Sequence, residues 1–292
     1  MLPLRHRSPS GSILLSAGTG AIRVFRMPVI TLLTDYGLKD SYVAEMKGAI
    51  LRIAPDATLV DISHDVGNYD IDEGAFHIAR SVPYFPEGTV HVGVVDPGVG
   101  SERRSIIIQA KGAWLVGPDN GLLAPAAERL GVERVFEITK RDLLPEKISD
   151  VFDGRDTFGP AGALLSKGVH PEEIGVEIHE YKRLESYQPA VSGNEAEATI
   201  IHVDGFGNLV TNVTYEILDG LGVKDGASMI VSAGNEEHEL PYVRRFSAVS
   251  EGELLLLVAG GGYLELAVNQ GNASDRLGIG KGDRVRLIVP QK

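Results

Sequence analysis

The chain of 292 residues is longer than the usual single domain of about 100 to 200 residues, and we expect two domains. Its 28 Lys and Arg against 40 Asp and Glu give a net charge of -12, which argues against binding to nucleic acid or anionic lipid and suits a cationic ligand. It has no Cys, so thiolate metal sites and disulfides are excluded, and with no apolar run near the roughly 18 residues of a membrane span we expect a cytoplasmic protein.

Residues 1–26 differ in character from the rest of the chain. Arg5, His6 and Arg7 precede a short apolar stretch from Ile13 to Leu15, which gives this segment a vague resemblance to a secretion signal. The stretch is shorter than the roughly 7 to 15 apolar residues that a signal needs. We therefore expect an extension outside the fold, either disordered or due to a start assigned upstream of Met27.

The next part of the chain alternates between β-like and helical patterns. Asp70 and Glu73 form a D-x-x-E capping pattern that predicts the start of a helix. The predicted order is strand Val29–Leu33, helix Val43–Ile53 ended by Pro55, strand Thr58–Ile62, a helix from Asp70, and strand Val90–Val95.

A hairpin and a further helix follow. Ser105–Ala110 and Ala113–Val116 are separated by a two-residue turn at Lys111-Gly112, and Gly121–Leu130 has a helical pattern. Such alternation predicts an α/β domain at residues 27–185, with a mainly parallel sheet covered by helices on both faces. Ligands bind beyond the carboxyl ends of the strands of such sheets. Asp35 and Asp96 both fall at these ends.

The character of the sequence changes after Gly175. Glu180–Glu197 is polar and has no helical period, and we place a linker at residues 186–197. Residues 198–292 are expected to form a smaller, barrel-like all-β domain. Its predicted strands are Thr199–Val203, Ala227–Val231, Glu253–Val258, Tyr263–Val268 and Arg284–Val289.

Five polar or glycine-rich segments could carry chemistry. Each has a purely structural alternative: a helix cap for an Asp at a strand end, a turn at Asp-Pro-Gly, or a salt-bridged helix start. The segments are Thr34–Ser41, Val95–Arg104, Phe152–Pro160, Asp204–Asn208 and Gly260–Tyr263.

In this order the segments resemble the S-adenosyl-L-methionine hydrolases that form adenosine, the hydroxide adenosyltransferases, which are related to fluorinases and chlorinases. The resemblance spans Pro28 to Val289. The matching stretches are Thr34-Asp35-Tyr36-Gly37, Asp70 to Arg80 followed by Tyr84 to Thr89, Val95 to Gly100, Gly117 to Leu123, Gly154-Arg155-Asp156 and Phe206-Gly207-Asn208.

The resemblance implies roles for both parts of the chain. Asp35 would hold the ribose diol, Asp40 the methionine ammonium, and Tyr69 would pack near the ribose. In the β domain, Asn208 would hydrogen-bond adenine, Phe206 and Phe246 would contact the nucleoside, and the peptide at Gly260 and Gly261 would meet the amino-acid end. It also implies a homotrimer with sites between subunits.

The resemblance further implies an Asp-Arg-His group that positions or activates the attacking water. Asp96 and Arg103 occupy the first two places, but Asp153 stands where relatives commonly have the histidine. A second departure is Ala259-Gly260, where relatives usually carry an Asn-Ser pair that helps to bind the methionine carboxylate. Backbone amides are the expected substitute there, and Asp153 is expected to share the proton of the water.

The expected reaction is in-line attack of water on C5', because a sulfonium leaves without protonation and needs neither metal nor redox cofactor. Two alternatives stay open: a halide-using halogenase, which Asp96 disfavours, and a non-catalytic binder of S-adenosyl-L-methionine or adenosine. Metal-dependent hydrolysis is disfavoured, since His64, Asp65, His77 and His91 match no compact ligand motif.

Overall fold

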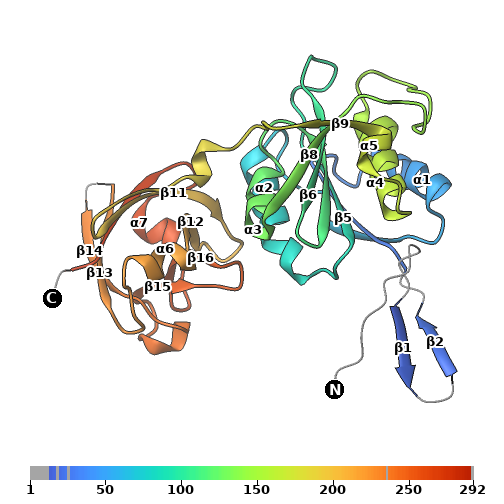
Figure 1. The fold of residues 1–292 in the computed structure, drawn as a ribbon. Helices are drawn as coiled ribbons and strands as arrows, with labels where there is room; N and C mark the ends of the chain where they lie inside the picture. Colours follow the sequence, from blue (N-terminus) through green and yellow to red (C-terminus); the bar gives the residue numbers. More distant parts are fainter. Residues whose placement is uncertain (1–12, 18–19, 25–26, 235, 291–292) are drawn as a thin grey trace. The chain divides into compact units, whose positions relative to one another are not determined.

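The computed structural model describes residues 13–17, 20–24, 27–234 and 236–290 (Figure 1). The chain divides into two compact units: the first reaches Lys182, and the second begins at Arg183 and also includes Ala79–Ser81. In the first part of the chain, β1 (Ile13–Ala17) pairs antiparallel with β2 (Gly20–Val24). The other residues of the predicted extension lie outside the described part, so the expectation for 1–26 stays a prediction.

The first unit is built on one seven-stranded sheet, with strand order β4-β3-β5-β7-β6-β8-β9. Its inner strands are almost fully buried, as expected for a sheet with covered faces. The strands are β3 (Val29–Thr34), β4 (Thr58–Ser63), β5 (Thr89–Val94), β6 (Ser105–Ala110), β7 (Ala113–Pro118), β8 (Val132–Ile138) and β9 (Gly175–Ile178).

The prediction of a mainly parallel sheet is only partly correct. β4, β3, β5 and β7 are joined by three parallel pairings, whereas β7–β6, β6–β8 and β8–β9 are three antiparallel pairings. The reversal begins at the β6–β7 hairpin, whose turn has Gly112 at φ +74°. The sequence interpretation placed this hairpin correctly but had no strand at β8 or β9.

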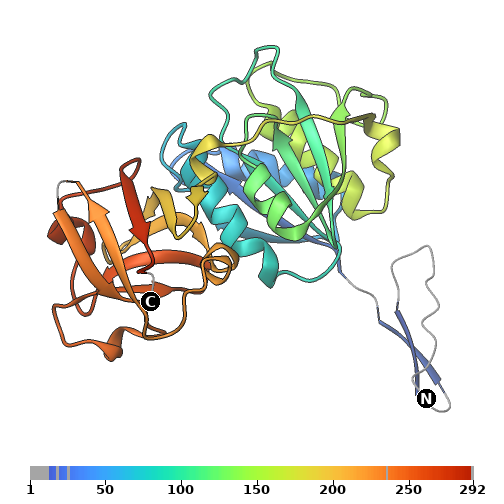
Figure 2. The same ribbon diagram turned by 60° about the vertical axis from the view of Figure 1, so that its left-hand side comes forward.

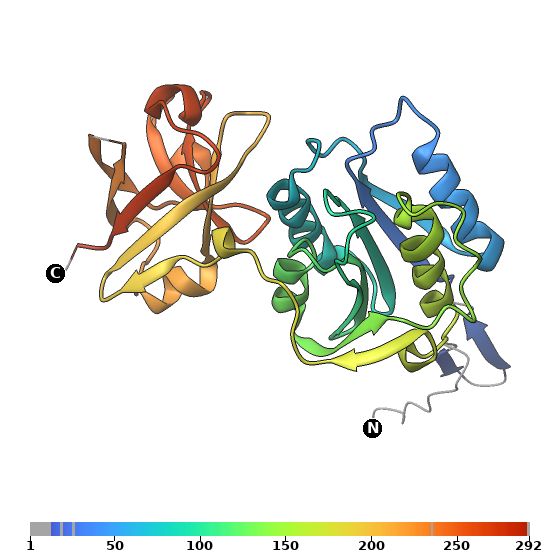
Figure 3. The ribbon, with the colours of Figure 1, turned by 90° about the horizontal axis from the view of Figure 1, so that it is seen from above.

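Helices cover both faces of this sheet (Figure 3). On one face α1 (Tyr42–Ile53) and α4 (Gly159–Ser166) pack their buried side chains, such as Met46 and Ala161, onto Ile30 and Val92. On the other face lie α2 (Ile71–Ser81) and α3 (Ala124–Leu130), and α5 (Pro171–Ile174) precedes β9. No helix in the described ranges is both long and apolar enough to cross a bilayer.

The N-terminus of α2 confirms the predicted cap and shows an additional contact. The Asp70 carboxylate accepts the Glu73 backbone N–H at 3.0 Å. The Glu73 carboxylate reaches further back and accepts the Gly67 N–H at 3.0 Å. These bonds fix the segment that leads from β4 into α2, which includes Asn68 and Tyr69.

The second unit is an antiparallel sheet of order β14-β13-β17-β11-β12-β16-β15, with β10 paired to β11 (Figure 2). A bridge between Tyr242 and Leu256 brings its two edges together, so the sheet is nearly a barrel. Its elements are β10 (Ala190–Ser192), β11 (Glu195–Val203), β12 (Leu209–Thr214), α6 (Tyr215–Gly220), β13 (Ser228–Ala233), β14 (Glu236–Pro241), β15 (Leu254–Val258), β16 (Tyr263–Val268), α7 (Ala273–Leu277) and β17 (Arg284–Ile288).

The polar stretch predicted as a linker contains ordered secondary structure. A 3-10 turn at Glu185–Tyr187, strand β10 and the first residues of β11 all lie within or next to residues 186–197. Both strands belong to the second sheet. The barrel-like unit therefore uses residues before 198.

Candidate functional site

Strand order creates a crevice at one edge of the first sheet. The chain passes from β3 through α1 to β4 on one side of β3, and then through α2 to β5 on its other side. The connection after β3 leads to β4, whereas the connection after β5 leads to β6 on the opposite side, past β7. The two connections therefore diverge between β3 and β5, which is the topological switch point where α/β sheets bind ligands. Asp35 directly follows β3, and Asp96 follows β5 by two residues.

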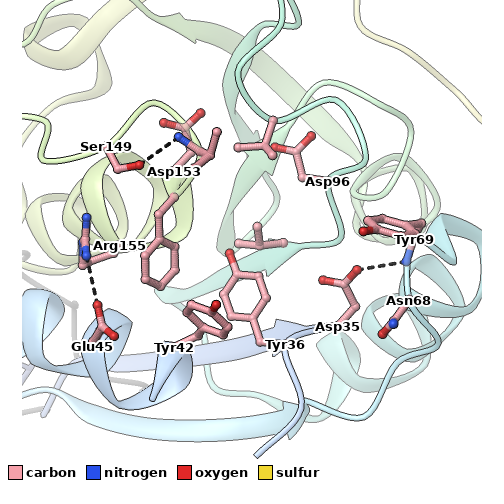
Figure 4. Close-up of a pocket in the computed structure, with 14 residues that line it drawn as sticks. Asp35, Tyr36, Tyr42, Glu45, Asn68, Tyr69, Asp96, Ser149, Asp153 and Arg155 are labelled. Carbon is pink, nitrogen blue, oxygen red and sulfur yellow. Dashed lines mark hydrogen bonds and ion pairs between the residues drawn. The ribbon is translucent and has the colours of Figure 1, made fainter. Parts of the chain in front are cut away.

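A cavity of about 530 Å³ lies at this point. Figure 4 shows Asp96 and Asp153 in its upper part, Asp35 and Tyr69 on the right, and Glu45 and Arg155 on the left. The cavity is lined by the end of β3, helix α1, the segments between β4 and α2 and after β5, and the segment before α4, which ends in the π-helical turn Gly154–Phe158. Its lining residues are Asp35, Tyr36, Tyr42, Glu45, Asn68, Tyr69, Val94, Asp96, Val99, Ser149, Val151, Phe152, Asp153 and Arg155.

Asp96 and Arg103 form a buried ion pair at the upper end. The Arg103 Nε donates to Asp96 Oδ2 at 2.8 Å and lies 3.1 Å from Oδ1, and Nη2 is 2.6 Å from Oδ2. The side chains are 8% and 5% exposed for Arg103 and Asp96. A carboxylate has about four lone-pair positions, so Asp96 retains capacity to accept a hydrogen bond from a water in the cavity.

Asp153 shares the same guanidinium. The Arg103 Nη2 donates to Asp153 Oδ2, while Asp153 Oδ1 accepts the Thr157 hydroxyl at 3.0 Å and lies 3.1 Å from Lys147 Nζ. Burial opposes ionisation of Asp153, but the contacts with Arg103, Lys147 and Thr157 outweigh it and hold the pKa of this carboxyl below its usual value. Asp153 is therefore an anion at neutral pH.

The Arg103 guanidinium is held by contacts with Asp96, Asp153, Ser105 and the Phe158 ring. Its Nη1 donates to the Ser105 hydroxyl at 2.9 Å, and its guanidinium carbon lies 5.2 Å from the centre of the Phe158 ring. Desolvation would lower the pKa of Arg103, but its bonds to Asp96 and Asp153 outweigh it and raise the pKa. The structure thus brings together all three residues predicted as the water-handling group, with a carboxylate in the third place.

Asp35 and Tyr69 meet on the other side of the cavity. The Tyr69 backbone N–H donates to Asp35 Oδ2 at 3.0 Å. Tyr69 has φ +64°, in the left-handed region that is uncommon for residues other than glycine. Asp35 lines the cavity, and its second carboxylate oxygen, Oδ1, can accept hydrogen bonds from the hydroxyl groups of a ligand.

Three aromatic rings form one wall of the cavity, which we call the aromatic wall: Tyr36, Tyr42 and Phe152. The ring centres of Tyr36 and Phe152 are 5.7 Å apart, and those of Tyr42 and Phe152 are 5.4 Å apart, all edge-on. Burial, followed by the charges of Asp35, Asp96 and Asp153, raises the pKa of Tyr36, so its hydroxyl stays protonated. The sequence interpretation missed this wall, although two of its members lie inside the Thr34–Gly37 and Phe152–Pro160 motifs.

Asp156 anchors the loop that carries Ser149. Its Oδ2 accepts the backbone N–H groups of Ile148 and Ser149 at 3.1 and 3.0 Å, and Arg155 Nε donates to Oδ1 at 2.8 Å. Burial opposes ionisation of Asp156, but these donors outweigh it and lower its pKa. Arg155 Nη1 also donates to Glu45 at 2.9 Å, which ties the loop to α1.

We expect Asp156→Asn to reduce the free energy of unfolding by about 1.5 to 3 kcal/mol at pH 7, because charge-assisted hydrogen bonds are lost in a buried place. Because the pKa of Asp156 is lower in the folded state than in the unfolded state, its ionised carboxylate stabilises the fold at pH values above the unfolded pKa of about 3.9. This stabilisation is lost as the pH falls through the folded-state pKa. The difference between wild type and variant in urea unfolding should therefore shrink toward pH 3. Asp142→Asn, on an exposed position of the same loop region, is the control; a constant difference at all pH values would contradict this assignment.

Two of the three histidines weighed for a metal, His64 and His91, are buried and used in packing, whereas His77 is 31% exposed and lies 3.6 Å from Glu73 on α2. His64 Nδ1 pairs with the Thr34 hydroxyl at 2.8 Å, and His91 Nδ1 pairs with the Thr31 hydroxyl at 2.8 Å, so both rings brace β3. Burial lowers the pKa of His91 to about 4, which keeps its ring neutral. The interpretation of His91 as an ordinary packed residue agrees with this environment.

Six predicted ligand contacts are not among the lining residues of this cavity. Asp40 lies exposed on the loop between β3 and α1. The other five belong to the second unit. One of them, Asn208, donates its side-chain N–H to the Asp204 carboxylate at 2.9 Å. They are Phe206 and Asn208 in the β11–β12 turn, Phe246 in a short 3-10 turn, and Gly260 and Gly261 between β15 and β16.

Comparisons with known proteins show what this chain is similar to. The chain matches the SAM hydroxide adenosyltransferase N-terminal domain over residues 30–175 and the C-terminal domain over residues 198–286. It is 40% identical to an (R)-S-adenosyl-L-methionine hydrolase of Salinispora tropica over 90% of this chain and 98% of the relative, and 29% identical to a fluorinase of Nocardia brasiliensis over 90% and 98%. The crystal structure of an uncharacterized conserved protein from Thermotoga maritima has a TM-score of 0.81 and 36% identity, covering 89% of this chain and 99% of that chain.

Proposed function

Because this chain belongs to the SAM hydroxide adenosyltransferase family, we propose that it hydrolyses S-adenosyl-L-methionine to adenosine and L-methionine. The observation that carries the proposal is the buried Asp96–Arg103–Asp153 cluster, which lies at the switch point where an α/β sheet takes its ligand. The net charge of -12 is compatible with a cationic sulfonium substrate.

In the proposed reaction, water forms a bond to C5' while the bond from C5' to sulfur breaks. The electron pair of that bond stays on sulfur, which becomes the neutral thioether of methionine, and the water gives up one proton. Asp96 orients the water and accepts its proton, and Arg103 stabilises the developing negative charge. Alignment of water about 3 to 3.5 Å from C5' supplies much of the acceleration.

The remaining substrate contacts are proposals from the same resemblance. Asp35 holds the ribose diol through the carboxylate that Tyr69 orients, and Tyr69 packs near the ribose. Asp40 receives the methionine ammonium. The second-unit residues Phe206, Asn208, Phe246, Gly260 and Gly261 contact adenine and the amino-acid end in a cytoplasmic homotrimer whose sites lie between subunits. The protein's own side chains supply the chemistry in this scheme, without a cofactor.

Halide transfer is the second enzymatic candidate, since fluorinases are more distant relatives. The cluster argues against it. A carboxylate about 4 Å from a bound anion repels it by roughly 4 kcal/mol at an effective dielectric of about 20. Asp96 lines the cavity and would stand next to such an anion, which leaves the cluster poorly suited to a halide.

We expect adenosine and methionine in equal amounts when the protein is incubated with S-adenosyl-L-methionine, with or without chloride or fluoride. Both sulfonium epimers should be offered, because the relatives' name specifies the R form. In water labelled with oxygen-18, mass spectrometry should find one label in the adenosine 5'-hydroxyl. A 5'-halogenated nucleoside would instead identify a halogenase, and binding without any product would identify a non-catalytic binder.

A further inference from the structure

The Asp96–Arg103–Asp153 cluster at the upper end of the cavity has two carboxylates and only one guanidinium. Asp96 and Asp153 are both acidic, and Arg103 Nη2 contacts an oxygen of each. The three side chains are 5% to 8% exposed, so water screens them little. Two carboxylates beside one guanidinium leave an excess negative charge, which a buried site tolerates only by protonation or by a further cation.

Lys147 supplies that cation. Its Nζ lies 3.1 Å from Asp153 Oδ1, the oxygen that Arg103 does not use. The Lys147 side chain is only 32% exposed, whereas its other acidic neighbour, Asp150, is 92% exposed at 3.6 Å. Lys147 therefore makes its closer contact with the buried carboxylate, and the four charges sum to zero.

Loss of Lys147 would leave the cluster two ways to respond. Asp153 could take up a proton, or Arg103 could move toward Asp153 and release Asp96. Either change alters the contact between Arg103 and Asp96, on which the proposed hydrolysis depends. We infer that Lys147 is a positioning residue for the reaction: by pairing with Asp153 it keeps Arg103 shared between Asp153 and Asp96.

The inference rests on the proposed function and predicts the direction of a pH effect. Arg103 and Lys147 contact Asp153 directly, Asp96 shares the Arg103 Nη2 with it, and Tyr36 lies close enough for the charge of Asp153 to act on it. Arg103 and Lys147 favour its ionised form, whereas Asp96 opposes it and the neutral Tyr36 contributes no charge. Removing Lys147 raises the pKa of Asp153. If the reaction needs ionised Asp153, a variant without Lys147 should therefore lose activity on acidification at a higher pH than the wild type does.

We expect Lys147→Met to shift the acid limb of the kcat/KM profile upward by about one pH unit, because a neighbouring opposite charge moves a carboxyl pKa by about 1 to 3 units. The loss should be in kcat at low pH, with KM nearly unchanged. Lys147→Arg should restore the wild-type profile. Lys140→Met is the matched control, since its Nζ donates to the Glu172 carbonyl instead of the cluster, and its profile should be unchanged.

A double variant tests whether Lys147 acts through Asp153. Lys147→Met combined with Asp153→Asn should be no less active than Asp153→Asn alone, because the two changes remove one interaction. Fully additive losses would overturn the inference. Thermal unfolding of each variant separates a folding defect from a positioning effect.

A measurement independent of turnover distinguishes this inference from the proposed function. Carbon-13 NMR of the aspartate carboxyls should show the Asp153 titration at a higher pH in Lys147→Met than in the wild type. An unchanged Asp153 titration overturns the role of Lys147, even if the wild type releases adenosine. A wild type that releases no adenosine overturns the proposed hydrolysis, whatever the NMR shows.

Discussion

Asp96→Asn should abolish adenosine release, with a loss of about 10² to 10⁴-fold in kcat, the usual contribution of a positioned acid or base. Asparagine has nearly the same shape, but its amide cannot accept the water's proton. Because Asp96 acts on the water and not on the nucleoside in this scheme, adenosine affinity should stay close to that of the wild type. Rapid-quench assays and calorimetric titration with adenosine measure the two quantities separately.

Glu102→Gln is the control for this experiment. It removes an exposed carboxylate from the loop that joins Asp96 to Arg103 and should leave adenosine release intact. A fully active Asp96→Asn enzyme would show that another group handles the water. A large loss of adenosine affinity would show instead that Asp96 contacts the nucleoside.

Arg103→Met should produce the largest loss of stability, about 3 to 5 kcal/mol, which is typical when one partner of a buried ion pair is removed. Asp96 and Asp153 would then face each other without the guanidinium that both contact. One of them should take up a proton, and adenosine release should be lost. Urea unfolding at pH 7 and proton uptake on folding measure these effects.

Two variants sharpen the result. Arg103→Lys keeps the charge but cannot reproduce the planar fork that reaches Asp96, Asp153 and Ser105, so stability should recover more than activity. Arg104→Met breaks the neighbouring pair with Asp119, at 2.8 Å, and should cost stability while the folded protein stays active. Equal losses of activity at both arginines would mean that the effect is one of folding alone.

The sequence predicted the parts of the site that strand order determines. Asp35 and Asp96 follow buried apolar runs, and the rule that ligands bind at the carboxyl ends of parallel strands is sufficient to bring them to one crevice. Arg103 and Asp153 were found through motif resemblance alone. Spacing could not pair them, since 50 residues separate the two and only the tertiary fold makes the contact.

Other parts depend on packing that periodicity does not encode. Lys147 lies in a polar segment whose sequence indicates only an exposed loop. Its contact with Asp153 depends on Asp156, which accepts the backbone N–H groups of Ile148 and Ser149 and so fixes the segment next to Lys147. Strands β8 and β9 were missed because β8 is half exposed and β9 is only four residues long. Their antiparallel pairings, together with the β6–β7 hairpin, are why the sheet is less parallel than the alternation of elements suggested.

The left-handed backbone at Tyr69 has a consequence for how the first unit meets a ligand. A residue other than glycine in this region costs on the order of 1 kcal/mol or more, and that cost is met when the unit folds. In return, the Asp35 carboxylate is oriented by the Tyr69 amide before any ligand arrives. The receptor is thus preorganised on this side, so less rotational entropy remains to be lost at the moment of association.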